Sequence, residues 1–186
     1  NMGAIPIHAW HSRITDLEHP DWCVLDLDPK AAPFKDVIAV AKLIHELLEE
    51  IELPGFLKTS GASGLHILIP IQRQLTHNQS KTLGELLARV IVARQSDICT
   101  ITRSVRKRED KVYIDYMQNG HGQLLVAPFS ARAEEAASVS MPVEWNELNG
   151  RLSNSRFHIK NAITRLKKHG DPCLLYTSDA ADELLG

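Results

Sequence analysis

The chain has few cysteines, and none is placed to pair with another. Three occur in 186 residues, Cys23, Cys99 and Cys173, and no two of them form a CxxC pair. A disulfide framework and a zinc ribbon are therefore not indicated. Scattered, unpaired thiols are typical of a reducing compartment, so we expect a cytoplasmic protein.

The sequence also lacks long apolar runs and an excess of basic charge. No segment approaches the ~18 consecutive apolar residues of a membrane helix, and nothing resembles a signal peptide, so no membrane partner is expected. The formal net charge is -2, whereas nucleic-acid-binding domains are usually basic. Any contact with nucleic acid must be local. What is present, 44% hydrophobic and 24% charged residues, is the composition of one globular domain.

Both ends of the sequence differ from what a natural domain boundary would show. A strand-like pattern begins almost at Asn1, which predicts that part of a larger domain is missing on this side. At the other end, CLLYTSDAADE (173–183) matches what one frame of a common transposase sequencing adapter encodes. We therefore expect a folded core in 1–172 and a non-native tail in 173–186. Genomic DNA that continued in frame with the same codons would contradict this view of the tail.

Two carboxylates interrupt an apolar run, WCVLDLDPK, at residues 22–30. Alternate side chains of a strand share a face, so Asp26 and Asp28 lie side by side while Cys23, Leu25 and Leu27 enter the core. Two acids fixed next to each other repel unless a cation lies between them, and hard divalent ions prefer oxygen ligands. The pattern predicts a metal site; the alternative is a solvated strand end.

A second stretch, KTSGASGLHILIPI (58–71), joins small residues to a strongly apolar strand. Gly61 and Gly64 allow the backbone to approach a ligand closely, and successive N–H groups in such a turn can form an anion-binding nest. Lys58 and Ser60 add a positive charge and a hydroxyl donor. His66 lies on the strand face opposite the isoleucines. Phosphate binding is the functional interpretation, and a plain hairpin is the alternative.

A third stretch, KVYIDYMQ (111–118), places Asp115 among β-branched and aromatic residues. A carboxylate is costly to bury there without a cation partner, which makes Asp115 the natural third metal ligand. The sequence Asn119-Gly120 predicts a turn, and 123–129 the returning strand of a hairpin. The preceding basic segment, 103–111, is most simply a solvated loop.

Helical periodicity occurs in three segments, 33–53, 79–95 and 159–168, and 142–148 is compatible with a short helical turn. Residues 4–10 are compatible with an edge strand. In the second helix the predicted buried stripe is Leu83, Leu86, Leu87, Val90 and Ile91. Together these elements predict an α/β fold, in which a mixed central sheet bears the acids on one face and helices pack against the other face.

The three stretches, with VAPFSARA (126–133) and PVEW (142–145) after them, resemble the polymerase/primase domain of bacterial DNA ligase D. That family belongs to the archaeo-eukaryotic primase superfamily and acts in non-homologous end joining. The resemblance runs from about His8 to Pro172. It implies that 1–172 is a primase-polymerase-like catalytic core without its N-terminal part, from a bacterial, nucleoid-associated protein.

The resemblance also implies which residues form the site. Asp26 and Asp28 match the first motif and Asp115 the third, and these motifs hold two catalytic divalent ions, Mn²⁺ or Mg²⁺. The second motif contacts the triphosphate of the incoming nucleotide, and an HxW element (His8 and Trp10) and two polar positions lie near the same pocket. The implied nucleotide-binding residues are Lys58, Ser60, Gly61, Gly64, His66, His8, Gln118 and Arg132.

The implied activity is metal-dependent addition of nucleotides, from an NTP or dNTP, to a DNA 3′-hydroxyl at breaks. The implied partners are DNA ends with a 5′-phosphate, a nucleoside triphosphate, Ku, and ligase and nuclease modules, fused or separate. Two features depart from the family. Glu134 stands where a second arginine often follows the VAP motif, and the N-terminal portion that helps to bind template and 5′-phosphate is missing, which puts strong DNA binding in doubt.

Two other classes of protein stay open at this point. A strand-end DxD is also the nucleophile motif of haloacid-dehalogenase-like phosphatases, with Asp26 as nucleophile, although Lys30 stands where that family commonly has threonine or valine. A non-catalytic nucleic-acid-binding module is the third class, although three acids facing a phosphate cleft would repel nucleic acid without metal. A zinc site at His8, His11, His19 and Cys23 has no compact ligand spacing in its favour.

Overall fold

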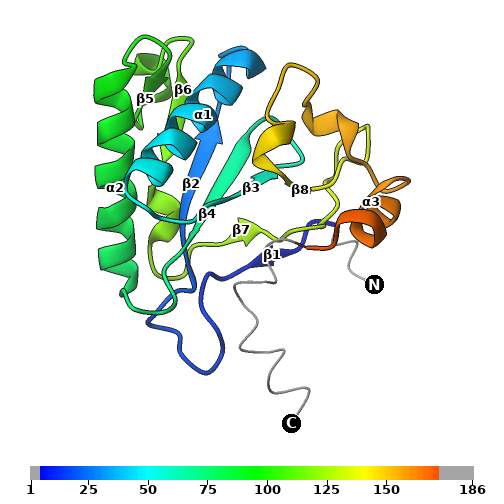
Figure 1. The fold of residues 1–186 in the computed structure, drawn as a ribbon, viewed down its shortest axis with the longest axis horizontal. Helices are drawn as coiled ribbons and strands as arrows, with labels where there is room; N and C mark the ends of the chain where they lie inside the picture. Colours follow the sequence, from blue (N-terminus) through cyan, green and yellow to red (C-terminus); the bar gives the residue numbers. More distant parts are fainter. Residues whose placement is uncertain (1–4, 172–186) are drawn as a thin grey trace.

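The centre of the molecule is a six-stranded mixed sheet (Figure 1). The computed structural model describes residues 5–171, so the predicted tail 173–186 lies outside the described residues. The strand order is β5-β6-β2-β4-β3-β8, and every pair is antiparallel except the parallel pair β5 and β6. The strands are β2 (Trp22–Asp28), β3 (Phe56–Thr59), β4 (Leu65–Pro70), β5 (Cys99–Thr100), β6 (Val112–Asp115) and β8 (Pro142–Val143).

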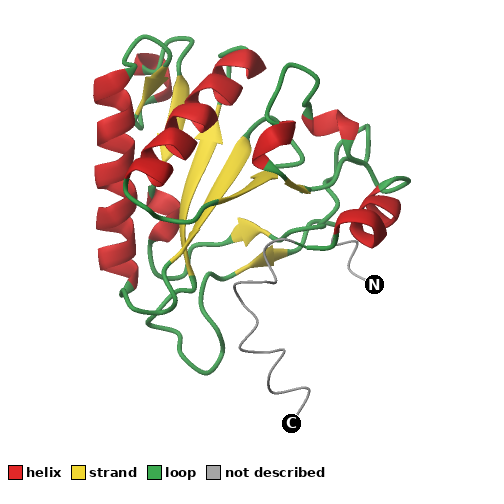
Figure 2. Ribbon diagram, viewed as in Figure 1, coloured by secondary structure: helices red, strands yellow, loops and turns green. Residues whose placement is uncertain are grey.

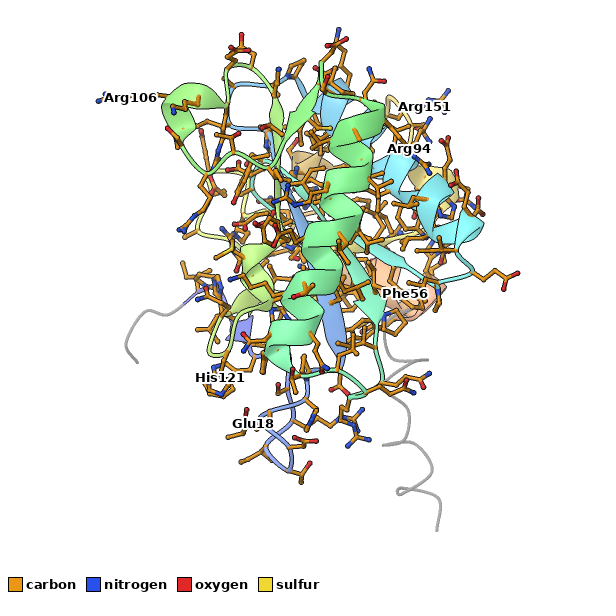
Figure 3. The ribbon with its side chains drawn as sticks, turned by 90° about the vertical axis from the view of Figure 1, so that its left-hand side faces the viewer. Glu18, Phe56, Arg94, Arg106, His121 and Arg151 are labelled. Atoms are coloured by element: carbon orange, nitrogen blue, oxygen red, sulfur yellow. The ribbon has the colours of Figure 1, made fainter. Side chains whose placement is uncertain are left out.

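Two long helices, α1 (Phe34–Glu50) and α2 (His77–Arg94), cover one face of this sheet (Figure 2). Their buried side chains form one core with Leu25 and Leu27 of β2 and Ile67 of β4. At the outer surface Arg94 of α2 donates two hydrogen bonds, of 2.9 and 2.6 Å, to the carboxylate of Glu50 in α1 (Figure 3). The predicted α/β fold with helices opposite the acids is confirmed.

The buried face of α2 differs from the predicted stripe. Leu86 is 57% and Val90 39% exposed, so the prediction was wrong for these two residues. The helix instead turns a face of small residues toward the sheet: a Cβ added at Gly84 would lie 3.4 Å from Cys23 Sγ. The buried residues of α2 are His77, Ser80, Gly84, Leu87, Ala88 and Ile91. The buried face of α2 therefore combines small residues with Leu87 and Ile91.

The second face of the sheet is partly covered by a small two-stranded sheet. β1 (His8–Ala9) pairs antiparallel with β7 (Leu125–Val126), and Leu125 packs with Val24 and Leu68. The predicted hairpin of 111–118 with 123–129 was therefore wrong. β6 ends at Asp115 because its carboxylate accepts the Met117 amide at 2.9 Å and turns the chain into a 3₁₀ helix (Met117–Asn119).

The remaining elements are short. β3 and β4 form an antiparallel hairpin, so Lys58 lies in a strand and only residues 60–64 form the connecting loop. The C-terminal helix α3 (Ala162–His169) buries none of its residues. Cys23 and Cys99 are free and buried. A helix of sufficient length and apolar character to cross a membrane does not occur within residues 5–171.

Candidate active site

Four polar residues form one row across four neighbouring strands. Lys58 of β3 is opposite His66 of β4, His66 is opposite Asp26 of β2, and Asp26 is opposite Asp115 of β6. Residues directly opposite each other on paired strands project from the same face of a sheet. The register of the sheet therefore brings three of the sequence stretches together on the face that the long helices leave open.

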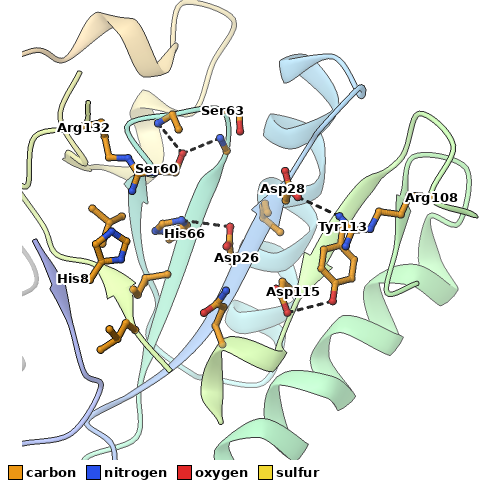
Figure 4. Close-up of a pocket in the computed structure, with 17 residues that line it drawn as sticks. His8, Asp26, Asp28, Ser60, Ser63, His66, Arg108, Tyr113, Asp115 and Arg132 are labelled. Atoms are coloured by element: carbon orange, nitrogen blue, oxygen red, sulfur yellow. Dashed lines mark hydrogen bonds and ion pairs between the residues drawn. The ribbon is translucent and has the colours of Figure 1, made fainter. Parts of the chain in front are cut away.

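Three members of this row, His66, Asp26 and Asp115, border a cavity of about 340 Å³ between the sheet and the β1–β7 pair (Figure 4). Most of the residues singled out in the sequence line it. They are Asp26, Asp28, Asp115, Ser60, Gly64, His66, His8, Gln118 and Arg132. Lys58, Gly61 and Trp10 do not belong to its lining. The cavity thus combines three carboxylates with histidine, hydroxyl and guanidinium donors.

The carboxylates Asp26 and Asp115 face each other across the β2–β6 pair. Burial raises the pKa of Asp115; the hydrogen bond from the Met117 amide opposes this, and the charge of Asp26 adds to the increase. On the other side of Asp26, His66 Nε2 lies 3.4 Å from Asp26 Oδ1. Burial, followed by the charge of Lys58, lowers the pKa of His66, which favours the neutral imidazole.

Asp28 is held by a residue that the sequence had not singled out. The Arg108 guanidinium donates to Asp28 Oδ2 at 3.2 Å and lies over the Tyr113 ring, 3.6 Å from its centroid. The Tyr113 hydroxyl in turn donates to Asp115 Oδ1 at 3.3 Å. Burial and then Asp115 raise the pKa of Tyr113 to about 12. In the sequence, the signal for Arg108 was its place in the basic segment 103–111, which directly precedes β6.

The donor set fits divalent metal ions in part. Within residues 5–171, no three His, Cys, Asp or Glu side chains form a preorganised metal-binding group. Two carboxylates are nevertheless opposite each other, and a cation between them would offset the raised pKa of Asp115. Oxygen ligands of this kind suit Mg²⁺ or Mn²⁺. Asp28 lines the same cavity, and its carboxylate is bonded to Arg108.

The loop 60–64 is closed by Ser60. Its hydroxyl accepts the amides of Ala62 at 3.1 Å and Gly64 at 2.9 Å, and its own amide donates to the Gly64 carbonyl at 3.0 Å. Gly61 has a φ of +73°, and its amide donates to Asn154 Oδ1 at 2.9 Å. Two of the amides expected to face a ligand are thus used by Ser60, and that of Gly61 by Asn154.

Lys58 differs most from its expected place. Its side chain is fully buried, and Nζ lies 2.7 Å from His66 Nδ1, 2.7 Å from Ser140 Oγ and 2.9 Å from the Val126 carbonyl oxygen. The ammonium therefore lies behind His66 and is separated from the cavity by it. Its residue type suggested a phosphate ligand, but the register of β3 places it within the fold.

Comparisons with known proteins relate this chain to a family. The family model of the LigD primase-polymerase domain matches residues 1–173. The multifunctional non-homologous end joining protein LigD of Pseudomonas aeruginosa is 34% identical over 89% of this chain, and the bifunctional LigD of Bacillus subtilis is 29% identical over 100% of it. The chain spans 20% and 30% of the length of these two relatives.

A solved structure is similar over the same region. The polymerase domain from Mycobacterium tuberculosis ligase D, in complex with DNA, superimposes with a TM-score of 0.80 at 27% sequence identity. The match covers 87% of this chain and 56% of that chain. With a family model that spans nearly the whole sequence and a shared fold, the chain belongs to the LigD primase-polymerase domain family.

Proposed function

We propose that this chain is a metal-dependent nucleotidyltransferase that adds nucleotides from an NTP or dNTP to a DNA 3′-hydroxyl at breaks. The observation that carries the proposal is the row His66–Asp26–Asp115 along a cavity that also holds Ser60 and Arg132. Carboxylates for cations and donors for phosphates are the two requirements of phosphoryl transfer, in which positioning and charge neutralisation account for most of the catalysis.

In this proposal Asp26, Asp28 and Asp115 hold two divalent ions. Ions bound there supply the positive charge that favours ionisation of the attacking hydroxyl and stabilises the leaving pyrophosphate. His66 presents Nε2 to the cavity beside Asp26, where it can donate to a phosphate oxygen. Arg132 lies on the wall toward the loop 60–64 and would orient the triphosphate from that side, whereas Ser60, whose hydroxyl accepts the amides of Ala62 and Gly64, would shape the loop there (Figure 4).

The proposed partners are DNA ends with a 5′-phosphate, a nucleoside triphosphate, Ku, and ligase and nuclease modules. The relatives support DNA as a partner in end joining: two are non-homologous end joining proteins described as multifunctional and bifunctional, and the similar solved structure is a complex with DNA. The proposed setting is a bacterial cytoplasm, at the nucleoid.

The test is Mn²⁺-dependent addition of a labelled ribonucleotide to gapped DNA with a 5′-phosphate. We expect Asp115→Ala to reduce addition roughly 100-fold or more, because metal-ion catalysis contributes several kcal/mol. Asp110→Ala removes an exposed carboxylate just before the same strand and should leave the rate unchanged. Addition that survives Asp115→Ala would refute the assignment, and a phospho-aspartate trapped at Asp26 would establish the phosphatase alternative instead.

A further inference from the structure

The fully buried Lys58 is the one charged member of the polar row that does not reach the cavity. Burying an ammonium is unfavourable unless its N–H groups are hydrogen-bonded. Its side chain lies on the same sheet face as His66, its partner in the β3–β4 register. Lys58 therefore needs an acceptor for each of its N–H groups, and His66 is one of the neighbours that can accept.

The contacts of Lys58 fix the direction of its hydrogen bonds. The Val126 carbonyl can only accept, and the Ser140 hydroxyl already donates to the Thr59 carbonyl at 2.8 Å, so toward Lys58 it accepts. An ammonium has no lone pair to offer a third partner. The 2.7 Å contact with His66 is therefore a bond from Lys58 Nζ to Nδ1 of the ring.

A ring nitrogen that accepts a hydrogen bond carries no proton. A neutral histidine whose Nδ1 accepts must carry its proton on Nε2. That nitrogen is the one beside Asp26 Oδ1, at 3.4 Å, on the cavity side of the ring. The opposite tautomer would place an N–H against the ammonium of Lys58 and an unprotonated nitrogen against a carboxylate.

We propose that Lys58 is a positioning residue: through its bond to Nδ1 it holds His66 in the Nε2–H tautomer, with a donor aimed at the cavity, and it does not itself touch the nucleotide. One part of this inference rests on the proposed function, namely that the Nε2–H donor binds a phosphate oxygen. The placement follows from the contacts of Lys58, and the tautomer follows from these contacts together with the Asp26 carboxylate beside Nε2.

The first test reads the tautomer directly in the full chain, free of metal and nucleotide. Long-range ¹H–¹⁵N correlation at a fixed pH of about 7.5, with His66 assigned by comparison with His66→Gln, should show an unprotonated Nδ1 and a protonated Nε2. A proton on Nδ1 would overturn the proposal. Because this measurement needs neither a Lys58 variant nor activity, it stands even where Lys58→Met fails to fold or the chain shows no nucleotide addition.

The second test asks whether Lys58 acts through His66. Lys58→Met should shift the tautomer of His66 and weaken Mn²⁺-dependent binding of a fluorescent nucleoside triphosphate about 10- to 100-fold, the usual effect of losing such a supporting contact. In a His66→Gln background the same substitution should cause no further loss. A further loss would mean that Lys58 touches the nucleotide directly and would overturn the proposal. Lys42→Met, at an exposed lysine of α1, is the matched control and should change neither signal.

Discussion

Substitution of Gly64 by alanine tests how closely the loop 60–64 approaches β2. A Cβ built at Gly64 would lie 2.0 Å from the Leu27 carbonyl oxygen, well inside the shortest contacts that real Cβ atoms make, which are about 3.0 Å. The obstacle is backbone, so no side-chain rotation can relieve it. The loop and β2 must therefore separate by about 1 Å, and Leu27 lies between Asp26 and Asp28 in that strand.

The expected loss of stability follows from this overlap. Overpacking a core costs about 1–3 kcal/mol, and we expect the upper end because the Leu27 carbonyl belongs to a central strand. At roughly 2–4 °C per kcal/mol for a chain of this size, the melting temperature should fall by about 6–12 °C. Nucleotide addition should fall further than the folded fraction does, because the shift of β2 moves both aspartates.

The assay is urea and thermal unfolding followed by circular dichroism, with Gly150→Ala as the matched control. A Cβ at Gly150 would meet nothing within 4 Å, and its φ lies outside the left-handed region. We expect that control to stay within about 0.5 kcal/mol of the parent chain. Equal stability of Gly64→Ala and Gly150→Ala would show that the loop does not press against Leu27.

Three further substitutions test the electrostatics. Burial raises the pKa of Asp115 above 3.8. Protonated Asp115 therefore stabilises the fold, and this stabilisation is lost as pH rises through the folded pKa. Asp115→Asn, which cannot ionise, should be more stable than the parent chain at pH 7 in EDTA. Mn²⁺ at a hundred times its Kd should stabilise the parent by about 2.7 kcal/mol and the variant much less, which thermal unfolding would detect. Arg108→Gln should lower the free energy of unfolding by about 1–3 kcal/mol, since the guanidinium is only 11% exposed and also donates to the Thr102 and Arg103 carbonyls, but it should tighten Mn²⁺ binding by calorimetry; the same tightening in Arg106→Gln would contradict a specific role. Burial lowers the pKa of His11 to about 4 from 6.5, so its contribution is present above pH 6.5 and about 3 kcal/mol is lost as pH falls through 4; urea titrations should show this loss in the parent and not in His11→Phe.

The acidic strands were predictable because their information is local. The alternation in β2 places Asp26 and Asp28 on one side and Leu25 and Leu27 on the other, and the structure has this arrangement. Each acid then needed only a partner strand with the correct register. That both neighbours of Asp26 would be polar, His66 and Asp115, followed from no single stretch, because register is set by the assembled sheet.

The partner of β7 could not be predicted from turn residues. The sequence Asn119-Gly120 is a hairpin signal, but the Asn119 side chain is buried and bridges the Val24 backbone, accepting from its amide at 2.7 Å and donating to its carbonyl at 2.8 Å. Tertiary hydrogen bonds therefore outweighed local turn preference. Val126 therefore pairs with His8, more than a hundred residues away in the sequence, and not with β6.

Arg108 illustrates a different limit. A run of basic residues on its own is most often a solvated loop, and nothing local distinguishes Arg108 from Arg106 or Lys107. The difference is three-dimensional: Arg108 also donates to the carbonyls of Thr102 and Arg103, at 3.0 and 3.1 Å, which fix its guanidinium over Tyr113. The sequence therefore locates the basic segment, but only the backbone around it determines that Arg108 is the residue that contacts Asp28.

The balance of charge at the site predicts how the proposed metal ions and nucleotide would bind. Asp26, Asp28 and Asp115 line the cavity with Arg108 and Arg132, and Lys58 lies directly behind it, so three carboxylates are matched by three cations. Two divalent ions alone would add about four positive charges to this balanced site, and a fully ionised triphosphate about four negative ones. Only the two together preserve the balance in an environment where uncompensated charge is costly. The metal ions and the nucleotide should therefore each strengthen the binding of the other, since such coupling is reciprocal. We expect Asp28 to give up its bond with Arg108 when they bind, which would make the Asp28 carboxylate available to a metal ion and the Arg108 guanidinium available to a phosphate.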